Sequence, residues 1–321
     1  MPQILSIGEV MVELSPAGSH QNKRLMALGF AGDTYNTAVY LARLGLEVGF
    51  FTRLGDDPYS AEAIATMAAE GLATSGVEVI PGRTAGLYMI ANQANGERNF
   101  TFWRSQSPAR DLFSSQRSLA TFKQHLQQTQ QVYFSGITLA ILSEAARVEF
   151  FSLLQGFRAK GGRVVFDNNY RQALWPDQNS AQIAMQQALE CADSALLTDD
   201  DYERLWGSAE FAQVLQRCRN AGVHEVVLKR GSDPVCVAWR VGQGELLTAE
   251  VAVPVVNDVI DTTAAGDSFN AGYLTARAQG QTPVKAAQFG SRCAAIVIRH
   301  RGAIVEREVF LAEFMQNQYY V

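Results

Sequence analysis

Short apolar runs alternate with longer stretches of helical periodicity along most of this chain. The runs that have the length of buried strands are residues 4–7, 132–135, 164–166, 195–197, 225–228 and 235–239. Between them, residues 144–160, 181–191 and 209–220 have helical spacing and few helix breakers. Alternation of this kind predicts βαβ units, and therefore an α/β fold with a mostly parallel sheet.

Two of the predicted helices are followed by clear stop signals. Gly161-Gly162 follows the first, and the last ends in Asn220-Ala221-Gly222. No internal repeat, low-complexity tract or Pro/Gly/Ser-rich linker divides the chain, so we expect a single domain over residues 1–321. In open α/β sheets, ligands bind beyond the carboxyl ends of the strands, and we expect the functional site there.

One segment, residues 86–104, interrupts the alternation. Asn95-Gly96 is a strong hairpin turn signal, and a two-residue turn there would pair Tyr88 with Trp103. With a companion hairpin near residues 10–30, this segment would form a small sheet beside the main one. It is either a simple edge hairpin or a lid that excludes water from a reacting group.

Composition excludes several classes of protein. The net charge of −5 and the pI near 5.5, without a run of Lys or Arg, argue against nucleic-acid binding. No stretch reaches the roughly 20 apolar residues that span a bilayer, and the first residues lack a signal-peptide pattern. We therefore expect a cytoplasmic protein with no membrane partner. Widely spaced histidines suggest no zinc site, and the separated cysteines predict buried free thiols: Cys191, Cys218, Cys236 and Cys293.

The most informative stretch is residues 261–269, Asp-Thr-Thr-Ala-Ala-Gly-Asp-Ser-Phe. Small residues allow close approach of a ligand, and the first amides of the apolar helix that follows would form an anion site. Asp267 would stand at that anion hole, as a phosphotransferase requires. An unperturbed aspartate has a pKa of about 3.9, so we expect an ionised Asp267 at neutral pH without special tuning. Alone, the same pattern is also typical of an ordinary helix cap.

A second glycine-bearing segment, residues 29–45, leads into an Ala-rich helix. Gly32 permits close approach, while Asp33 and Asn36 offer partners for sugar hydroxyls. Together, the two segments resemble the paired signatures of the PfkB, or ribokinase-like, carbohydrate kinases. The resemblance covers essentially the whole chain. It departs from the family pattern at Ala31 and Ala264, each of which replaces a glycine, and alanine is small enough for both places.

This resemblance implies a ribokinase-like three-layer α/β/α fold with a small β-sheet lid, and ATP and Mg²⁺ as co-substrate and cofactor. Asp267 would be the general base, beside an anion hole built by Ala264, Ala265 and Gly266. The positions implied for sugar binding are Gly32, Asp33, Asn36, Tyr88, Phe102, Trp103, Arg104, Arg171 and Asp267. The positions implied for ATP binding are Asn169, Tyr170, Arg171, Lys229, Arg230, Gly231, Ser232, Asp233, Pro234, Ala264, Ala265 and Gly266. Metal ligands stay unassigned, because Thr198 and Asp201 replace the Asn and Glu of the family's magnesium-organising motif.

Within this family, the likeness is greatest to the kinases of 2-keto-3-deoxygluconate. An acidic sugar needs a cation to offset its carboxylate, and Arg104 and Arg171 are two candidates. The alternative interpretation of each arginine is a solvated surface charge or an ion pair. The predicted hairpin register places Arg104 on the face opposite Tyr88 and Trp103, so the lid strand must end or bulge near it.

Other readings stay open at this point. The chain resembles fructokinases and ribokinases of the same family, and a non-catalytic sugar or nucleotide sensor is a weaker alternative. A homo-oligomer is expected if the lid edge is exposed. The sequence leaves open K⁺ activation and the choice between gluconate-derived and galactonate-derived acceptors.

Overall fold

The computed structural model describes residues 2–21, 23–92, 98–242 and 244–316. Its main sheet has nine strands in the order β13-β12-β11-β10-β9-β8-β1-β4-β5. Every pair from β11 to β5 is parallel, whereas β12 and β13 add in antiparallel fashion. The strands of this sheet are β1 (Ile4–Ile7), β4 (Val48–Gly55), β5 (Val77–Ile80), β8 (Gln131–Ser135), β9 (Arg163–Asp167), β10 (Ser194–Thr198), β11 (Glu225–Arg230), β12 (Asp233–Val241) and β13 (Glu245–Val251).

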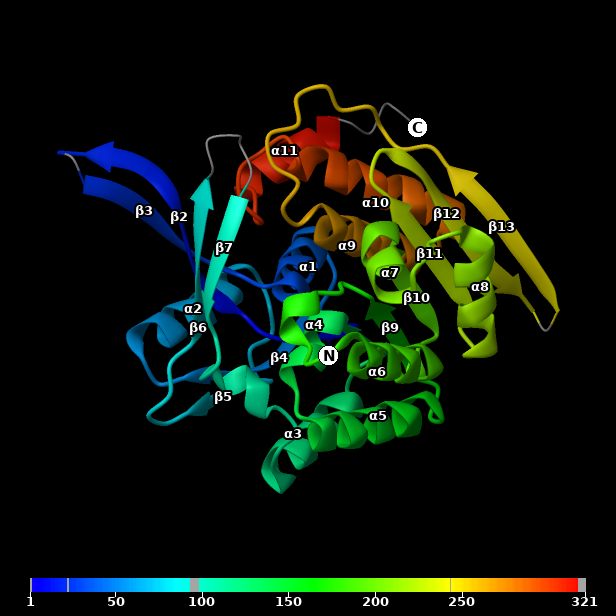
Figure 1. The fold of residues 1–321 in the computed structure, drawn as a ribbon, viewed down its shortest axis with the longest axis horizontal. Coiled ribbons are helices and arrows are strands. Elements are labelled where there is room, and N and C mark those ends of the chain that lie inside the picture. Colours follow the sequence, from blue (N-terminus) through cyan, green and yellow to red (C-terminus); the bar gives the residue numbers. More distant parts are fainter. Residues whose placement is uncertain (1, 22, 93–97, 243, 317–321) are drawn as a thin grey trace.

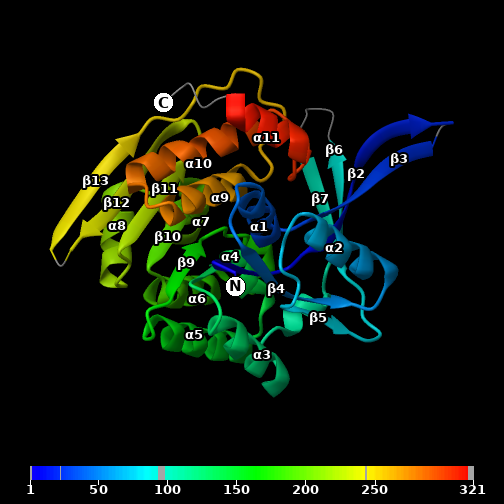
Figure 2. The same cartoon turned by 180° about the vertical axis from the view of Figure 1, so that it is seen from behind.

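Helices cover both faces of this sheet, which confirms the predicted three-layer α/β/α fold (Figures 1 and 2). One face packs against α1 (Asp33–Arg43), α2 (Pro58–Ala69), α9 (Ala265–Ala278), α10 (Pro283–Val297) and α11 (Arg307–Gln316). The other packs against α3 (Gln116–Leu126), α4 (Gly136–Ile141), α5 (Glu144–Arg158), α6 (Gln178–Cys191), α7 (Asp199–Trp206) and α8 (Phe211–Asn220). The predicted strands and helices all lie within these elements or overlap them closely.

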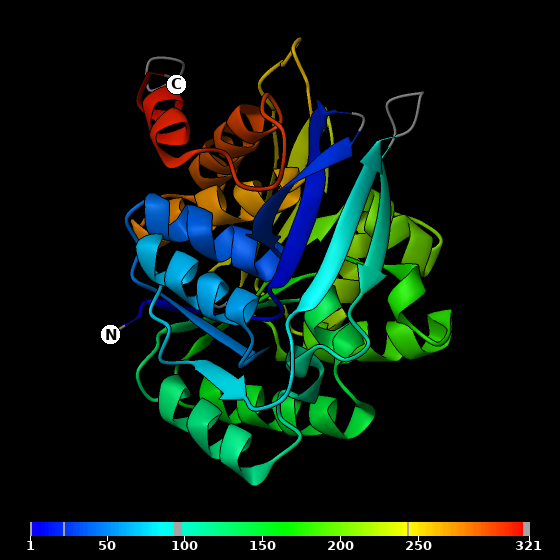
Figure 3. The ribbon, with the colours of Figure 1, turned by 90° about the vertical axis from the view of Figure 1, so that its left-hand side faces the viewer.

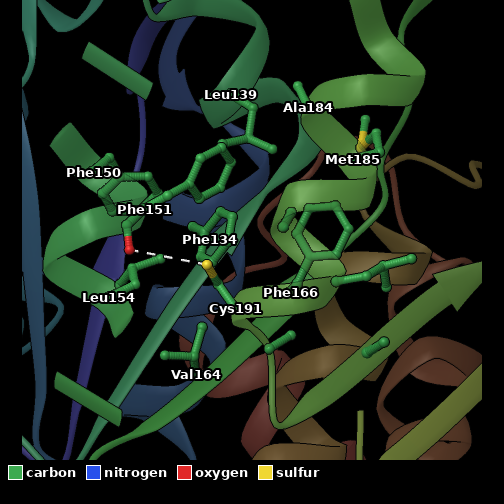
Figure 4. Close-up of a cluster of buried hydrophobic side chains, with 14 of the residues drawn as sticks. Phe134, Leu139, Phe150, Phe151, Leu154, Val164, Phe166, Ala184, Met185 and Cys191 are labelled. Carbon is green, nitrogen blue, oxygen red and sulfur yellow. Dashed lines mark hydrogen bonds between the residues drawn. The ribbon is translucent and has the colours of Figure 1, made fainter. Parts of the chain in front are cut away.

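Alternation along the strands sends side chains into two separate cores. In β8, Val132 and Phe134 join the core under α3 to α8, whereas Tyr133 joins the core under α1 and α9. Aromatic rings dominate the first core, where Phe134 contacts Phe150 edge-to-face with ring centroids 5.0 Å apart. Figure 4 shows these rings against β8, β9, α5 and α6.

A second sheet has the strand order β3-β2-β6-β7 and stands at the side of the body, away from β12 and β13 (Figures 1 and 3). Its strands are β2 (Met11–His20), β3 (Lys23–Ala31), β6 (Gly86–Asn92) and β7 (Arg98–Trp103). They come from the two segments expected to form a lid. Strand β2 pairs antiparallel with β3 and parallel with β6, which in turn pairs antiparallel with β7.

The predicted register of the β6–β7 hairpin is wrong by one residue. Tyr88 pairs with Phe102, and Leu87 pairs with Trp103. The predicted Asn95-Gly96 turn lies outside the described residues. A one-residue slip changes the face of every side chain on one strand, so Tyr88 and Phe102 share a face while the half-exposed Trp103 lies on the other. The expected conflict at Arg104, two positions beyond Phe102, therefore disappears.

Two further expectations can be compared with the structure. The four cysteines are free and buried, as predicted. Within the described ranges, no helix is long and apolar enough to cross a bilayer.

The aromatic core generates a stability prediction. Phe150 is fully buried on α5, so Phe150→Ala should lower the free energy of unfolding by about 3–5 kcal/mol, because it leaves a cavity that the packed rings cannot fill. Chemical denaturation measures this loss. Val148→Ala, at a 60% exposed position of the same helix, is the matched control and should change stability by about 0.5 kcal/mol or less. Equal losses in the two variants would contradict this account of the core.

Candidate active site

A cavity of about 1000 Å³ opens at the carboxyl ends of the parallel strands. Residues that directly follow β1, β9, β10 and β11 line it, together with residues of the small sheet and the start of α9. The two signature segments, residues 29–45 and 261–269, thus meet in one place. This is the location that the sheet topology predicts, since the chain reverses its direction of strand addition beside β1.

The first turns of α1 and α9 are joined directly. Asn36 donates from Nδ2 to Oδ2 of Asp267 across 2.8 Å, and Thr37 donates to the Asp267 carbonyl across 3.2 Å. Asp33 is held in the same way, by Nδ2 of Asn169 at 2.9 Å. Both carboxylates are at least nine-tenths buried and line the cavity. The structure therefore brings together Asp33, Asn36 and Asp267 as the sequence suggested.

Gly32 lines the cavity, and its lack of a side chain has a structural reason besides the predicted approach of a ligand. A Cβ at this position would lie 2.1 Å from the carbonyl oxygen of Glu9, so the backbone after β1 already fills the space. The absence of a side chain lets α1 begin directly against that backbone. Glu9 itself lines the cavity and was missed by the sequence analysis.

The start of α9 presents free amides to the cavity. Ala265 donates its amide to the Thr262 carbonyl at 3.2 Å, whereas the described hydrogen bonds include no acceptor for the amides of Gly266 and Asp267. Ala264 caps the helix in the left-handed conformation, with φ 60°. Glycine adopts this conformation without strain, which explains the family's glycine there; alanine adopts it at a cost of about 1 kcal/mol or more.

Burial raises the pKa of Asp267 well above the ordinary range of an aspartate, and the nearby Asp33 carboxylate raises it further. The hydrogen bond from Asn36 and the charge of Lys229 oppose this shift. The expectation that the pKa of Asp267 is unperturbed is therefore wrong. A general base with a raised pKa is a stronger proton acceptor once ionised, which suits catalysis near neutral pH.

A buried polar network lies behind Asp267. Lys229 donates to Oδ1 of Asn270 at 2.9 Å and reaches Oδ1 of Asp167 at 3.5 Å. Asn270 in turn donates to Oδ2 of Asp167 at 2.9 Å and to the hydroxyl of Tyr133 at 3.0 Å. Asn270, Asp167 and Tyr133 were not among the predicted site residues.

Both arginines proposed for a sugar carboxylate line the cavity, and both already contact an acid. Arg104 forms a buried ion pair with Glu9, while its Nε has no partner within the described structure. Arg171 donates to both carboxylate oxygens of Asp201, at 2.9 and 3.0 Å, and its side chain is half exposed.

The remaining predicted residues divide into two groups. The cavity lining includes Tyr88, Phe102, Asn169, Arg230, Gly231, Ser232 and Thr198. Trp103, Tyr170, Asp233 and Pro234 do not line it; Tyr170 is buried in the core under α3 to α8.

The far end of the cavity is an apolar slot that sequence reasoning did not find. It lies between the segment after β13 and the small-residue face of α10, with Val253, Val256, Ala294, Ala295 and Ile298 in its walls. Ser291 is buried there, with no hydrogen-bond partner for its hydroxyl in the described chain. An apolar slot with a free hydroxyl suits a flat heterocycle with a polar edge.

No group of three or more His, Cys, Asp or Glu residues in the described ranges could hold a metal ion. Three carboxylates line the cavity at the ends of β9 and β10: Asp167, Asp200 and Asp201. Mg²⁺ commonly binds through one or two carboxylates and the substrate's phosphates, and this donor set fits that mode.

The chain resembles known sequences over most of its length. The model of the pfkB family of carbohydrate kinases matches residues 1–308. The 2-dehydro-3-deoxygluconokinase of Dickeya dadantii is 43% identical over 314 residues, which is 96% of this chain and 98% of that protein. The fructokinase of Vibrio alginolyticus is 30% identical over 312 residues, or 95% of each chain.

Solved structures share the fold. A PfkB protein from Polaromonas sp. JS666 superposes with a TM-score of 0.81 at 25% identity, over 96% of this chain and 99% of that one. A putative ribokinase II from Escherichia coli, in complex with ATP and Mg²⁺, superposes with a TM-score of 0.80 at 21% identity, over 99% and 100% of the two chains.

The raised pKa of Asp267 generates a prediction about stability and pH. Because the folded pKa lies above the unfolded value of about 3.9, the wild-type protein loses stability as pH rises through the interval between the two values. Asp267→Asn carries no such charge. We therefore expect its melting temperature, without ligands, to equal that of the wild type below the unfolded pKa of about 3.9 and to exceed it increasingly as the pH rises above that value.

Asp258→Asn is the control of opposite sign. In the wild type, a hydrogen bond from Arg299 lowers the pKa of Asp258, so this carboxylate contributes stability above its unfolded pKa. The melting temperature of Asp258→Asn should therefore not rise relative to that of the wild type as the pH increases. A gain in melting temperature for Asp267→Asn that does not vary with pH would contradict the assignment of a raised pKa.

Proposed function

The chain belongs to the pfkB family of carbohydrate kinases, and we propose that it transfers the γ-phosphoryl group of ATP to the 6-hydroxyl of 2-keto-3-deoxygluconate. The product is 2-keto-3-deoxy-6-phosphogluconate. One observation carries this proposal: the full-length likeness to a 2-dehydro-3-deoxygluconokinase at 43% identity, against 30% for a fructokinase. The two arginines that line the cavity support it, because an acidic acceptor needs a cation.

The arrangement of residues suggests how the reaction proceeds. The acceptor hydroxyl lies against Asp267, which takes its proton as the oxygen attacks the γ-phosphorus, and the free amides of Gly266 and Asp267 hold the phosphoryl oxygens. Asn36 fixes the orientation of the base. Most of the rate gain comes from positioning and charge stabilisation, since phosphoryl transfer passes through a loose transition state.

ATP would extend from the anion hole at α9 into the apolar slot, where Ser291 and α10 receive the base. Mg²⁺ would enter with the nucleotide and neutralise part of the phosphate charge, held through Asp167 or Asp201 and the phosphates. The small sheet, with Tyr88 and Phe102 facing the cavity, would exclude water from the acceptor end.

The sugar's carboxylate would share an arginine with a protein carboxylate. Arg104 keeps an unpartnered Nε beside the buried Glu9, and Arg171 extends from the strand end on a half-exposed side chain. Arginine has five N–H donors in a planar fork, so it can contact two carboxylates at once. K⁺ activation, homo-oligomer formation and cytoplasmic location stay predictions.

A coupled assay of ADP release over a panel of sugars tests the substrate directly. We expect the highest kcat/KM with 2-keto-3-deoxygluconate, lower values with its galactonate epimer, and little turnover with fructose or ribose. Faster turnover with either neutral sugar would refute the proposed acceptor and favour a fructokinase or ribokinase.

Arg171→Ala tests the role of charge in acceptor binding. A hydrogen bond between charged groups contributes about 1.5–3 kcal/mol, so KM for the sugar acid should rise roughly 10-fold to 150-fold, while the weak activity on neutral sugars should change little. Arg204→Ala is the matched control, because Arg204 also approaches Asp201, at 3.7 Å, but does not line the cavity. An equal rise in KM for both variants would remove Arg171 from acceptor binding.

A further inference from the structure

We propose that Lys229 is a catalytic residue that stabilises the γ-phosphoryl group during its transfer, and that Asn270 and Asp167 are its positioning residues. The inference rests on the proposed function, phosphoryl transfer in this cavity. It assigns Lys229 a role that is strongest in the transition state, beyond the general contact with ATP that the family resemblance implies.

The position of the ammonium group is the first argument. Lys229 is the fifth residue of β11 and is 7% exposed, yet it lines the cavity. Its Nζ lies 3.6 Å from the place where a Cβ on Gly266 would stand, at the first turn of α9. The cation thus sits beside the free amides that would hold the transferring group.

This position is electrostatically unfavourable unless an anion shares it. The N-terminus of a helix carries a partial positive charge, which repels a cation and attracts an anion. Asp167 offsets part of the charge from 3.5 Å away. A phosphoryl group placed between the helix terminus and Nζ would be stabilised by both, which is why we assign this space to it.

The hydrogen bonds of the ammonium leave one donor for a ligand. The ammonium group has three N–H donors; one donates to Oδ1 of Asn270 and one to Oδ1 of Asp167. The described bonds of Lys229 include no third acceptor. Asn270 lies one helical turn after Asp267 and contacts both Lys229 and Asp167, so it fixes the lysine relative to the base. The adjacent Arg230 is oriented differently, donating to the Pro234 carbonyl and to Glu250.

Lys229 forms and breaks no covalent bond during the chemical step. The acceptor oxygen forms a bond to the γ-phosphorus as the bond to the β,γ-bridging oxygen breaks, and that bond's electron pair leaves with ADP. The hydroxyl proton passes to Asp267. Lys229 exchanges no proton and donates a hydrogen bond to a γ-phosphoryl oxygen as that group moves from the leaving oxygen to the attacking one.

Lys229→Met tests this role, because it keeps the length of the side chain and removes the charge. Loss of one such donor costs about 10²–10³ in turnover, so kcat should fall by that factor. Calorimetry supplies a second readout. Affinity for ADP, Mg²⁺ and fluoroaluminate, which imitates the transferring group, should fall about 100-fold, while affinity for a non-hydrolysable ATP analogue changes less than about threefold.

Arg277→Met is the matched control. Arg277 pairs with Glu225 at the other end of β11, away from the cavity lining, so its loss should leave the ratio of the two affinities unchanged. Should Lys229→Met fail to fold, Lys229→Gln replaces it, because the amide removes the charge and keeps a donor beside Asn270 and Asp167, and the same ratio is measured.

Asn270→Ala tests positioning through a double-mutant cycle. It should weaken the fluoroaluminate complex in the wild-type background and have little further effect once Lys229 is Met. Equal losses in both backgrounds would mean that Asn270 does not act through Lys229.

Two results would overturn the proposal: equal weakening of the ATP analogue and the fluoroaluminate complex, which would make Lys229 a ground-state ligand only, or no weakening of either. Failure of the proposed acceptor is a separate outcome. In that case wild-type turnover on the sugar acid is absent, but the nucleotide affinities can still be measured and decide the role of Lys229.

Discussion

The hydrogen bond between Asn36 and Asp267 is the contact on which the site depends. It joins residues 231 positions apart and fixes the start of α1 against the start of α9. Neither helix could be placed this way by local propensity; both helices cover the same face of the parallel sheet, which brings their first turns to one edge. Because the Asp267 carboxylate is also the proposed general base, this one hydrogen bond both joins the two helices and orients the base.

The cavity holds more buried charge than stability alone would favour. Asp33, Asp167 and Asp267 lie close enough for their charges to interact, and burial raises the pKa of Asp33 and of Asp267. Each cation near them is matched with an acid: Arg104 with Glu9, and Lys229 with Asp167. A pre-organised set of charges costs folding free energy, and it removes the cost of reorganisation when an anionic acceptor and ATP enter.

Sequence patterns predicted the alternating strands and helices, the parallel sheet and the lid segments, because apolar periodicity and turn residues are local signals. The three layers and the convergence of the two signature segments were implied by the family resemblance, since no local signal relates Asn36 to Asp267 across 231 positions. The sequence patterns did not predict Glu9, which is recognisable only once Gly86 and Arg104 are packed around its carboxylate. The apolar slot was missed for a similar reason, since its walls come from separate elements. The hairpin register failed because it assumed a two-residue connection. Strands β6 and β7 instead pair Asn92 with Arg98, a register that a two-residue turn at 95–96 cannot give, and Trp103 consequently faces away.

The central claim is that Asp267 accepts the proton of the acceptor hydroxyl, and Asp267→Asn tests it most directly when turnover and binding are measured on the same preparation. The account predicts that kcat falls about 10²–10⁴-fold while the dissociation constants for ATP and the sugar acid stay within a few-fold of the wild type. Turnover at the wild-type rate would contradict it.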